Sequence, residues 1–173
     1  MIALFGMIAM TIGFIRRDLA WDGTWKIRQL HGRKTATISA PWPTERWDRE
    51  PQTENVLVRD ESVYFTVAVP RKFERLDVRL NALAPQTVEV GAEVIPHTLR
   101  YSTEPLRRSG REWVGSLNIL IVRQDLGKIN VVLRFPGAGR NTPALFEAIE
   151  FTFRRPPWTL KSFFIRLWQV IRQ

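Results

Sequence analysis

YFTVAVPRKFERLDVRLNALAPQTVEVGAE, residues 64–93, is the stretch that decides the fold. In its middle Leu76, Val78 and Leu80 alternate with charged residues. Alternation with a period of two predicts a β-strand that buries one face and exposes the other. Residues 63–69 form an apolar run that ends at a proline, which is typical of a second strand. The stretch therefore predicts a sheet packed against a core.

Short apolar segments of this kind recur toward the C-terminus, with turn-forming residues between them. The last of them slips out of alternation near Ala148, which predicts a β-bulge. Residues 39–55 contain three prolines and predict a long loop or the edge of a sheet. The pattern predicts a mainly β fold, an antiparallel sandwich or barrel. The further predicted strands are residues 87–90, 99–101, 114–122, 128–135 and 146–153.

A resemblance to a known kind of domain rests on two runs of sequence. Residues 64–93 look like the central strands of jelly-roll sandwiches of the galactose-binding-like kind: a strand, a proline, an alternating strand, and a short strand ending near glycine. INVVLRFPGAG, residues 129–139, followed by FEAIEFTFRR, residues 146–155, resembles their final two strands. The resemblance covers about residues 56–156 and implies a jelly-roll sandwich whose two ends lie together. Sugar sites of that family lie in variable loops, and no residue here matches such a motif.

The N-terminal segment IALFGMIAMTIGFI, residues 2–15, carries no charge and is followed by two arginines. As a helix it spans ~21 Å, which is short of the ~30 Å hydrocarbon core of a membrane. It can be a short membrane helix, a secretory signal or a buried core helix. We favour the membrane helix, over residues 1–21, because the segment has neither a basic region before it nor a polar stripe. Its expected membrane contacts are Leu4, Phe5, Ile8, Ile12, Phe14, Ile15 and Trp21, and its expected contacts with anionic headgroups are Arg16 and Arg17.

The C-terminal segment WTLKSFFIRLWQVIRQ, residues 158–173, follows two prolines that end the last strand. On a helical wheel its apolar residues share one side, and its polar side carries only positive charge. This predicts a basic amphipathic helix over residues 157–173 that lies on an anionic membrane or on a partner protein; packing on its own domain is the alternative. Its expected membrane or partner contacts are Trp158, Phe163, Phe164, Leu167, Trp168 and Ile171, and its expected headgroup contacts are Lys161, Arg166 and Arg172.

The composition excludes several kinds of chemistry. The chain has no cysteine, and its two histidines, His31 and His97, do not stand at metal-ligand spacing. No nucleophile elbow or phosphate-binding loop is present. We therefore predict no enzyme, no catalytic or metal site and no cofactor. The net charge of +9 favours an anionic partner, but no nucleic-acid-binding module accompanies it.

The sequence thus leaves two main functional hypotheses, with an enzyme of unfamiliar type as a third. The first is a non-enzymatic β-sandwich, residues 22–156, that is anchored by both ends to a bilayer and serves as a scaffold subunit of a larger membrane complex. Because positive charges favour the cytoplasmic side, we expect the domain there, at a bacterial inner membrane. The alternative is a carbohydrate-binding module tethered to the cell envelope. Its candidate glycan contacts are Trp42, Trp47 and Trp113.

Overall fold

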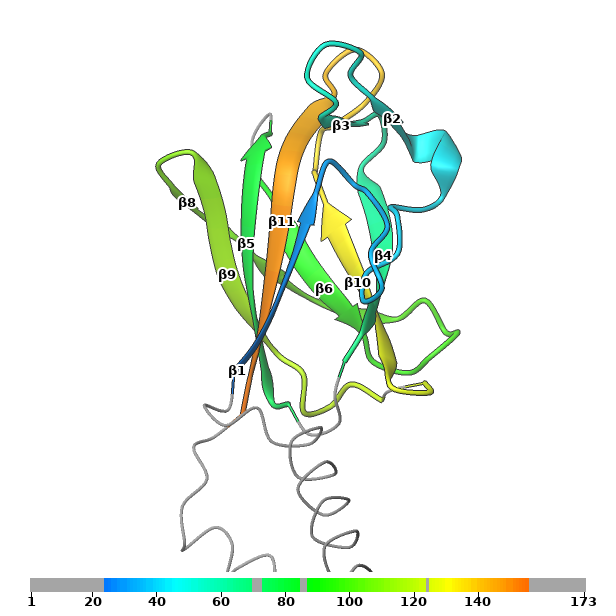
Figure 1. The fold of residues 1–173 in the computed structure, drawn as a ribbon, viewed down its shortest axis with the longest axis vertical. Coiled ribbons are helices and arrows are strands. Elements are labelled where there is room, and N and C mark those ends of the chain that lie inside the picture. Colours follow the sequence, from blue (N-terminus) through cyan, green and yellow to red (C-terminus); the bar gives the residue numbers. More distant parts are fainter. Residues whose placement is uncertain (1–23, 70–72, 85–86, 124, 156–173) are drawn as a thin grey trace, which may run out of the picture.

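Two antiparallel sheets pack face to face as a β-sandwich (Figure 1) in the computed structural model, which describes residues 24–69, 73–84, 87–123 and 125–155. The predicted mainly β fold is confirmed. One sheet has seven strands, in the order β2-β3-β11-β5-β9-β8 with β1 also paired to β11, and the other has four, in the order β4-β10-β6-β7. The strands are β1 (Thr24–Leu30), β2 (Trp47–Arg49), β3 (Val56–Val58), β4 (Ser62–Ala68), β5 (Arg75–Leu83), β6 (Glu89–Glu93), β7 (Tyr101–Pro105), β8 (Arg107–Ser109), β9 (Glu112–Asn118), β10 (Lys128–Arg134) and β11 (Ala144–Arg154), and a 3-10 helix covers Thr44–Arg46.

The longest strand, β11, organises the seven-stranded sheet. One of its sides pairs with β5, and the other pairs first with β3 and then with β1. Its register with β5 shifts between Phe146 and Ala148, so the predicted bulge is confirmed. Thr24 lies opposite Arg154, so the first and last described strands meet at one end of the sandwich, as the resemblance implied.

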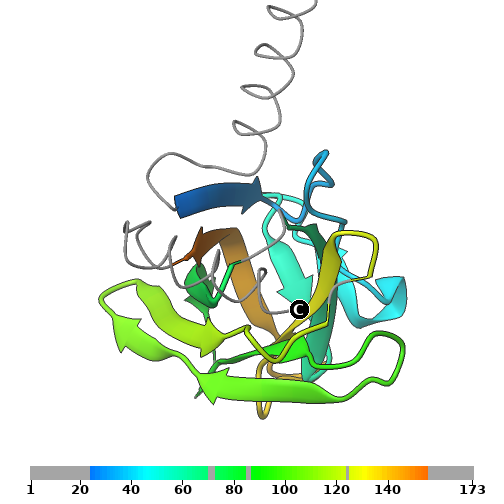
Figure 2. The same ribbon diagram turned by 90° about the horizontal axis from the view of Figure 1, so that it is seen from below.

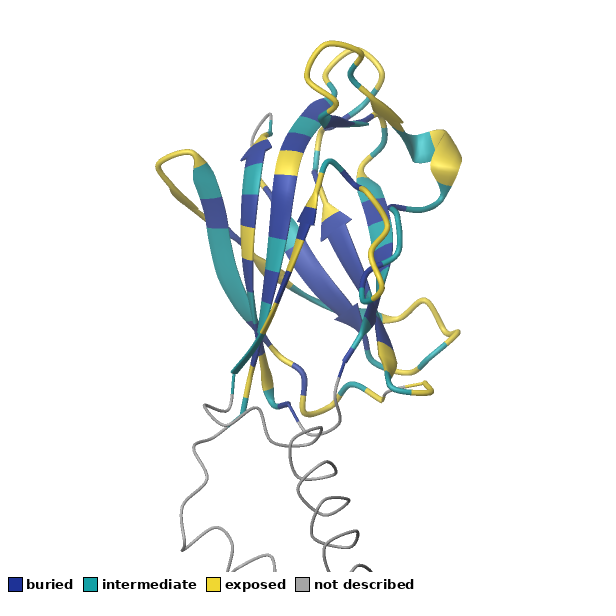
Figure 3. Cartoon of the chain, viewed as in Figure 1, coloured by how far each residue is buried: buried dark blue, intermediate teal, exposed yellow. Residues whose placement is uncertain are grey.

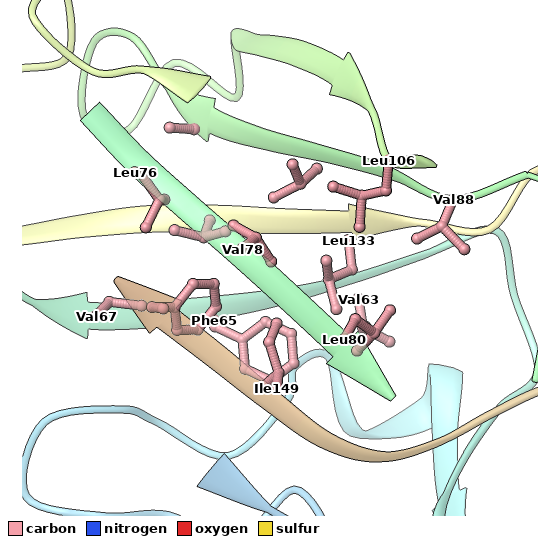
Figure 4. Close-up of a cluster of buried hydrophobic side chains, with 14 of the residues drawn as sticks. Val63, Phe65, Val67, Leu76, Val78, Leu80, Val88, Leu106, Leu133 and Ile149 are labelled. Atoms are coloured by element: carbon pink, nitrogen blue, oxygen red, sulfur yellow. The ribbon is translucent and has the colours of Figure 1, made fainter. Parts of the chain in front are cut away.

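Alternating side chains from the two sheets fill the core. Figure 4 shows Leu76, Val78 and Leu80 of β5 in the same cluster as Phe65 and its neighbours on β4, and all are at most 2% exposed. Burial therefore alternates along the strands as bands of different colour (Figure 3). Phe65 and Phe151 meet edge to face, with ring centroids 6.4 Å apart, which adds directional contacts to the burial of apolar area.

The structure corrects several predicted strand boundaries. β1 was not predicted, because Gln29 points inward and Leu30 outward, which breaks the apolar alternation. The buried Gln29 amide donates hydrogen bonds to the carbonyls of Arg33 and Ser39, which explains its polar character in the core. The strand predicted over residues 114–122 ends at Asn118, since the apolar residues after it leave the sheet.

The predicted terminal helices, residues 1–21 and 157–173, lie outside the described residues. Within the described ranges, no helix has the length and apolar character needed to cross a bilayer.

We predict that Phe151→Ala lowers the free energy of unfolding by about 3–5 kcal/mol, because it empties a fully buried position between the sheets. Leu83→Ala is the control: Leu83 is 70% exposed on the neighbouring strand, and its loss should change stability by no more than ~0.5 kcal/mol. Urea unfolding followed by circular dichroism measures both. Equal losses for the two variants would contradict the core described above.

Candidate functional site

The outer face of the four-stranded sheet carries a hollow that we call the sheet hollow. Its volume is about 220 Å³. Thr66 of β4 and Asn130 of β10 are register partners, and both point outward because Phe65 and Val131 beside them point into the core. The sheet hollow is lined by Trp42, Thr66, Glu93, Pro96, His97, Arg123, Asp125, Lys128, Ile129 and Asn130.

A buried carboxylate forms part of its wall. Glu93 is 2% exposed, and no cation pairs with it among the described residues. Its Oε1 accepts a hydrogen bond of 2.8 Å from the Leu99 backbone N–H, and its Oε2 accepts one of 2.7 Å from the Asn130 amide. Asn130 Oδ1 in turn accepts a 2.9 Å bond from the Thr66 hydroxyl. These bonds hold the three side chains in one fixed polar network.

Aromatic rings lie beside this network. Trp42 stacks on Tyr64, with ring centroids 4.7 Å apart, and its backbone N–H and carbonyl pair with those of Tyr64. Tyr64 also contacts Tyr101, at 5.6 Å between centroids, and the Arg46 guanidinium lies 5.8 Å from the Tyr64 ring centroid. The rings fix the position of Trp42, which belongs to an extended segment beside the edge strand β4.

Polar groups on two loops complete the rim. His97 Nε2 lies 3.2 Å from Asp125 Oδ2, which ties the β6–β7 loop to the β9–β10 loop. Arg123 and Lys128 line the sheet hollow as exposed cations. No cluster of three or more His, Asp or Glu side chains suited to a metal ion occurs in the described part of the chain. The arrangement offers hydrogen-bond donors and acceptors around an aromatic side chain.

A larger groove, of about 550 Å³, lies on the outer face of the seven-stranded sheet. No aromatic residue lines it. Asp77 there pairs with both Arg75 and Arg154, at 2.7 and 2.5 Å, and Glu150 pairs with Lys26 at 3.0 Å. These four lining charges already have ion-pair partners, and the groove lacks the aromatic surface that Trp42 gives the sheet hollow.

The structure separates the three tryptophans proposed from the sequence as glycan contacts. Trp42 lines the sheet hollow. Trp47, on β2 of the other sheet, is half-buried against the core. Trp113 is 6% exposed, and its indole N–H donates to the Ala82 carbonyl, so the expected surface position of Trp113 is corrected: the alternation of β9 turns it inward.

The expected membrane, partner and headgroup contacts, from Leu4 to Trp21 and from Trp158 to Arg172, all lie outside the described residues. Sequence reasoning missed Glu93 and Asn130. The only signal was a polar residue at an outward position of an apolar strand, and such positions are polar in most sheets.

No protein-family model matches the chain. No curated protein matches it either. Among solved structures, it is similar to the module TmCBM61 in complex with β-1,4-galactotriose, with 14% identity, a TM-score of 0.35, and 75% of this chain and 88% of that chain covered. It is also similar to the module CBM36 in complex with calcium and xylotriose, with 14% identity, a TM-score of 0.40, and 73% of this chain and 98% of that chain covered. A third similar structure is the low-affinity xylan-binding module CBM86 from Roseburia intestinalis, with 10% identity, a TM-score of 0.42, and 75% of this chain and 96% of that chain covered. The likeness is one of fold alone: the sandwich resembles those of carbohydrate-binding modules, and no residue correspondence is carried over from them.

Tyr101, in β7 of the four-stranded sheet, is expected to make the stability of the fold depend on pH. Burial, then the neighbouring Glu93 carboxylate, then Tyr64 raise the pKa of the Tyr101 phenol above its ordinary value of about 10. Its hydroxyl is buried and has no hydrogen-bond partner among the described residues. The unfolded chain therefore loses this proton at a lower pH than the folded chain. We predict that the contribution of Tyr101 to the free energy of unfolding is constant below about pH 10 and that the free energy falls as the pH rises above it.

The measurement is urea unfolding at a series of alkaline pH values, compared with Tyr101→Phe. The variant cannot ionise at this position, so its stability should fall less steeply with pH. Parallel pH profiles for the two proteins would show that Tyr101 does not ionise later in the folded state.

Proposed function

We propose that the protein is a carbohydrate-binding module and that the sheet hollow binds a saccharide. The observation that carries the proposal is the position of Trp42, fixed by its stack on Tyr64, beside the hydrogen-bonded network of Glu93, Asn130 and Thr66. An aromatic side chain beside a few fixed polar groups is the usual composition of a small-molecule site.

The aromatic ring of Trp42 and the polar groups of the network match the apolar faces and the polar edge of a sugar ring. A pyranose presents C–H groups on its faces, which pack on an aromatic ring, and hydroxyls at its edge. The Glu93 carboxylate accepts only, so it suits hydroxyl donors, and charge-assisted bonds of this kind are stronger than neutral ones. Arg123 and Lys128 supply donors for the remaining sugar oxygens.

The volume and the charge of the sheet hollow limit the kinds of saccharide that it can bind. The hollow of about 220 Å³ is smaller than the ~300–1,000 Å³ of typical ligand pockets, so it suits one or two sugar rings rather than a long chain segment. In the lining of the sheet hollow the two acidic residues Glu93 and Asp125 balance the two cations Arg123 and Lys128, so the site as a whole favours neither sign of charge on the ligand. We therefore propose a neutral saccharide.

The scaffold function at a membrane stays a prediction, as do the cytoplasmic placement and the partner subunits, because they rest on residues outside the described ranges. The jelly-roll connectivity, the N-terminal membrane helix and the C-terminal amphipathic helix are likewise proposals. The sandwich itself is compatible with either function.

We predict that the full chain binds at least one neutral glycan on a broad array and that Trp42→Ala and Asn130→Ala weaken this binding about 10-fold to 100-fold. The expected loss of ~1.4–2.8 kcal/mol is that of a ring contact or of hydrogen bonds to a buried site. Isothermal titration with the best array saccharide measures the affinities.

Two variants serve as matched controls. Trp47→Ala removes a tryptophan outside the sheet hollow, and Thr152→Ala changes the groove on the other sheet. Circular dichroism confirms that each variant is folded. A blank array, or equal affinities for the Trp42, Trp47 and Thr152 variants, would reject the sheet hollow as a saccharide site.

A further inference from the structure

Two loops at one end of the sandwich expose large apolar side chains. The β6–β7 loop carries Leu99, which is 69% exposed, and the β9–β10 loop carries Leu120, Ile121 and Leu126, which are 61%, 59% and 90% exposed. Ile95, at 39%, lies in the first of these loops. The Arg123 N–H donates to the Val94 carbonyl, so the two loops are joined. We call this surface the apolar end.

The described chain begins and finishes at the same end. Thr24 is opposite Arg154, Arg154 is opposite Arg75, and Arg75 is opposite Asn118, after which the β9–β10 loop begins. Figure 1 shows β1 starting and β11 finishing at the lower end, and Figure 2 views the sandwich from that side. Thr24 and Arg154 therefore lie at the same end of the sandwich as the β9–β10 loop.

Two of these positions, Leu99 and Leu126, hold leucine although neither the backbone conformation nor packing within the sandwich favours that residue there. Leu99 has a φ of 56° and Leu126 a φ of 48°, in the left-handed region that glycine and asparagine enter at lower cost. Both side chains point into solvent rather than into the core. A large apolar residue that is held in an unfavourable conformation and exposed to water points to contact with another apolar surface.

The charges around the loops identify that surface. Arg100, Arg123 and Lys128 are exposed, and none of them forms an ion pair among the described residues. The acidic residue of the described parts of these loops, Asp125, lies against His97. Apolar side chains flanked by unpaired cations match a bilayer with anionic lipids, because the side chains can enter the interface while the cations attract the headgroups.

We infer that the apolar end docks on a lipid bilayer, with the side chains of Leu99, Leu120, Ile121 and Leu126 entering the interface. The inference does not depend on saccharide binding. It concerns the sandwich itself, whatever the terminal segments do.

Because the chain has no cysteine, a single introduced cysteine can carry an environment-sensitive fluorophore. The full chain is labelled at Ile121→Cys or, as the matched control, at Ser109→Cys, which is exposed in the β8–β9 hairpin at the other end. Each protein is mixed with vesicles of phosphatidylcholine and phosphatidylglycerol, with and without lipids that carry a quencher in their acyl chains. We expect blue-shifted, quenchable emission at position 121 and water-like emission at position 109.

A second pair of variants separates docking from folding. Leu99→Gly with Leu126→Gly removes the exposed side chains and relieves the left-handed backbone, so the unfolding midpoint should stay the same or rise. In the Ile121-labelled protein these changes should reduce the blue shift and the quenching by at least half.

Water-like emission from both positions on vesicles would overturn the inference. It would also be overturned if position 121 shifted to the blue only as protein concentration rose without lipid, because the apolar end would then bind a second copy. Neither measurement uses a sugar, so its failure leaves the saccharide proposal unaffected.

Discussion

Both the core and the outer surface depend on the period of two along each strand. In β4 and β10, Phe65 and Val131 point inward and are fully buried, so Thr66 and Asn130 must point outward. A register slip of one residue would turn the polar network of the sheet hollow into the core and bring phenylalanine to the surface. The burial of apolar area that stabilises the sandwich therefore also places the candidate site.

The sheet hollow and the apolar end share the β6–β7 and β9–β10 loops. His97, Arg123 and Asp125 line the sheet hollow, and they belong to the same two loops as the exposed leucines of the apolar end. Together the proposals place a bound saccharide close to the headgroups of the bilayer, where a sugar on a lipid or a glycan lying along the membrane would be within reach. Trp42 approaches the site from the edge of the sheet, so the ring is held by β4 rather than by the loops.

The sandwich could be predicted because several strands alternate apolar and polar residues. β5 was recognised from the clean alternation of Leu76 and its neighbours, and β11 from an alternation interrupted near Ala148, where the bulge lies. β1 was not predicted because Gln29 points inward, and the hydrogen bonds that make this possible are visible only in the folded chain. The run after Asn118 was mistaken for a strand, since apolar residues facing solvent carry the same sequence signal as apolar residues facing a core.

The candidate site was less predictable than the fold. Trp42 could be named because a tryptophan in a proline-rich edge is conspicuous, but Trp113 was equally conspicuous and is buried. Glu93 and Asn130 are 37 residues apart in the sequence, and strand pairing alone brings them into hydrogen-bond distance. Long-range pairing of this kind leaves no local pattern to read.

Nuclear magnetic resonance of the labelled full chain, titrated with the saccharide it binds best, tests most directly whether the sheet hollow is the binding site. If it is, chemical-shift changes gather on the Trp42 indole N–H, the Asn130 side-chain amide and the backbone of Thr66. Changes centred instead on Arg79 and Thr152, in the groove of the seven-stranded sheet, would contradict it. So would a spectrum that no saccharide perturbs.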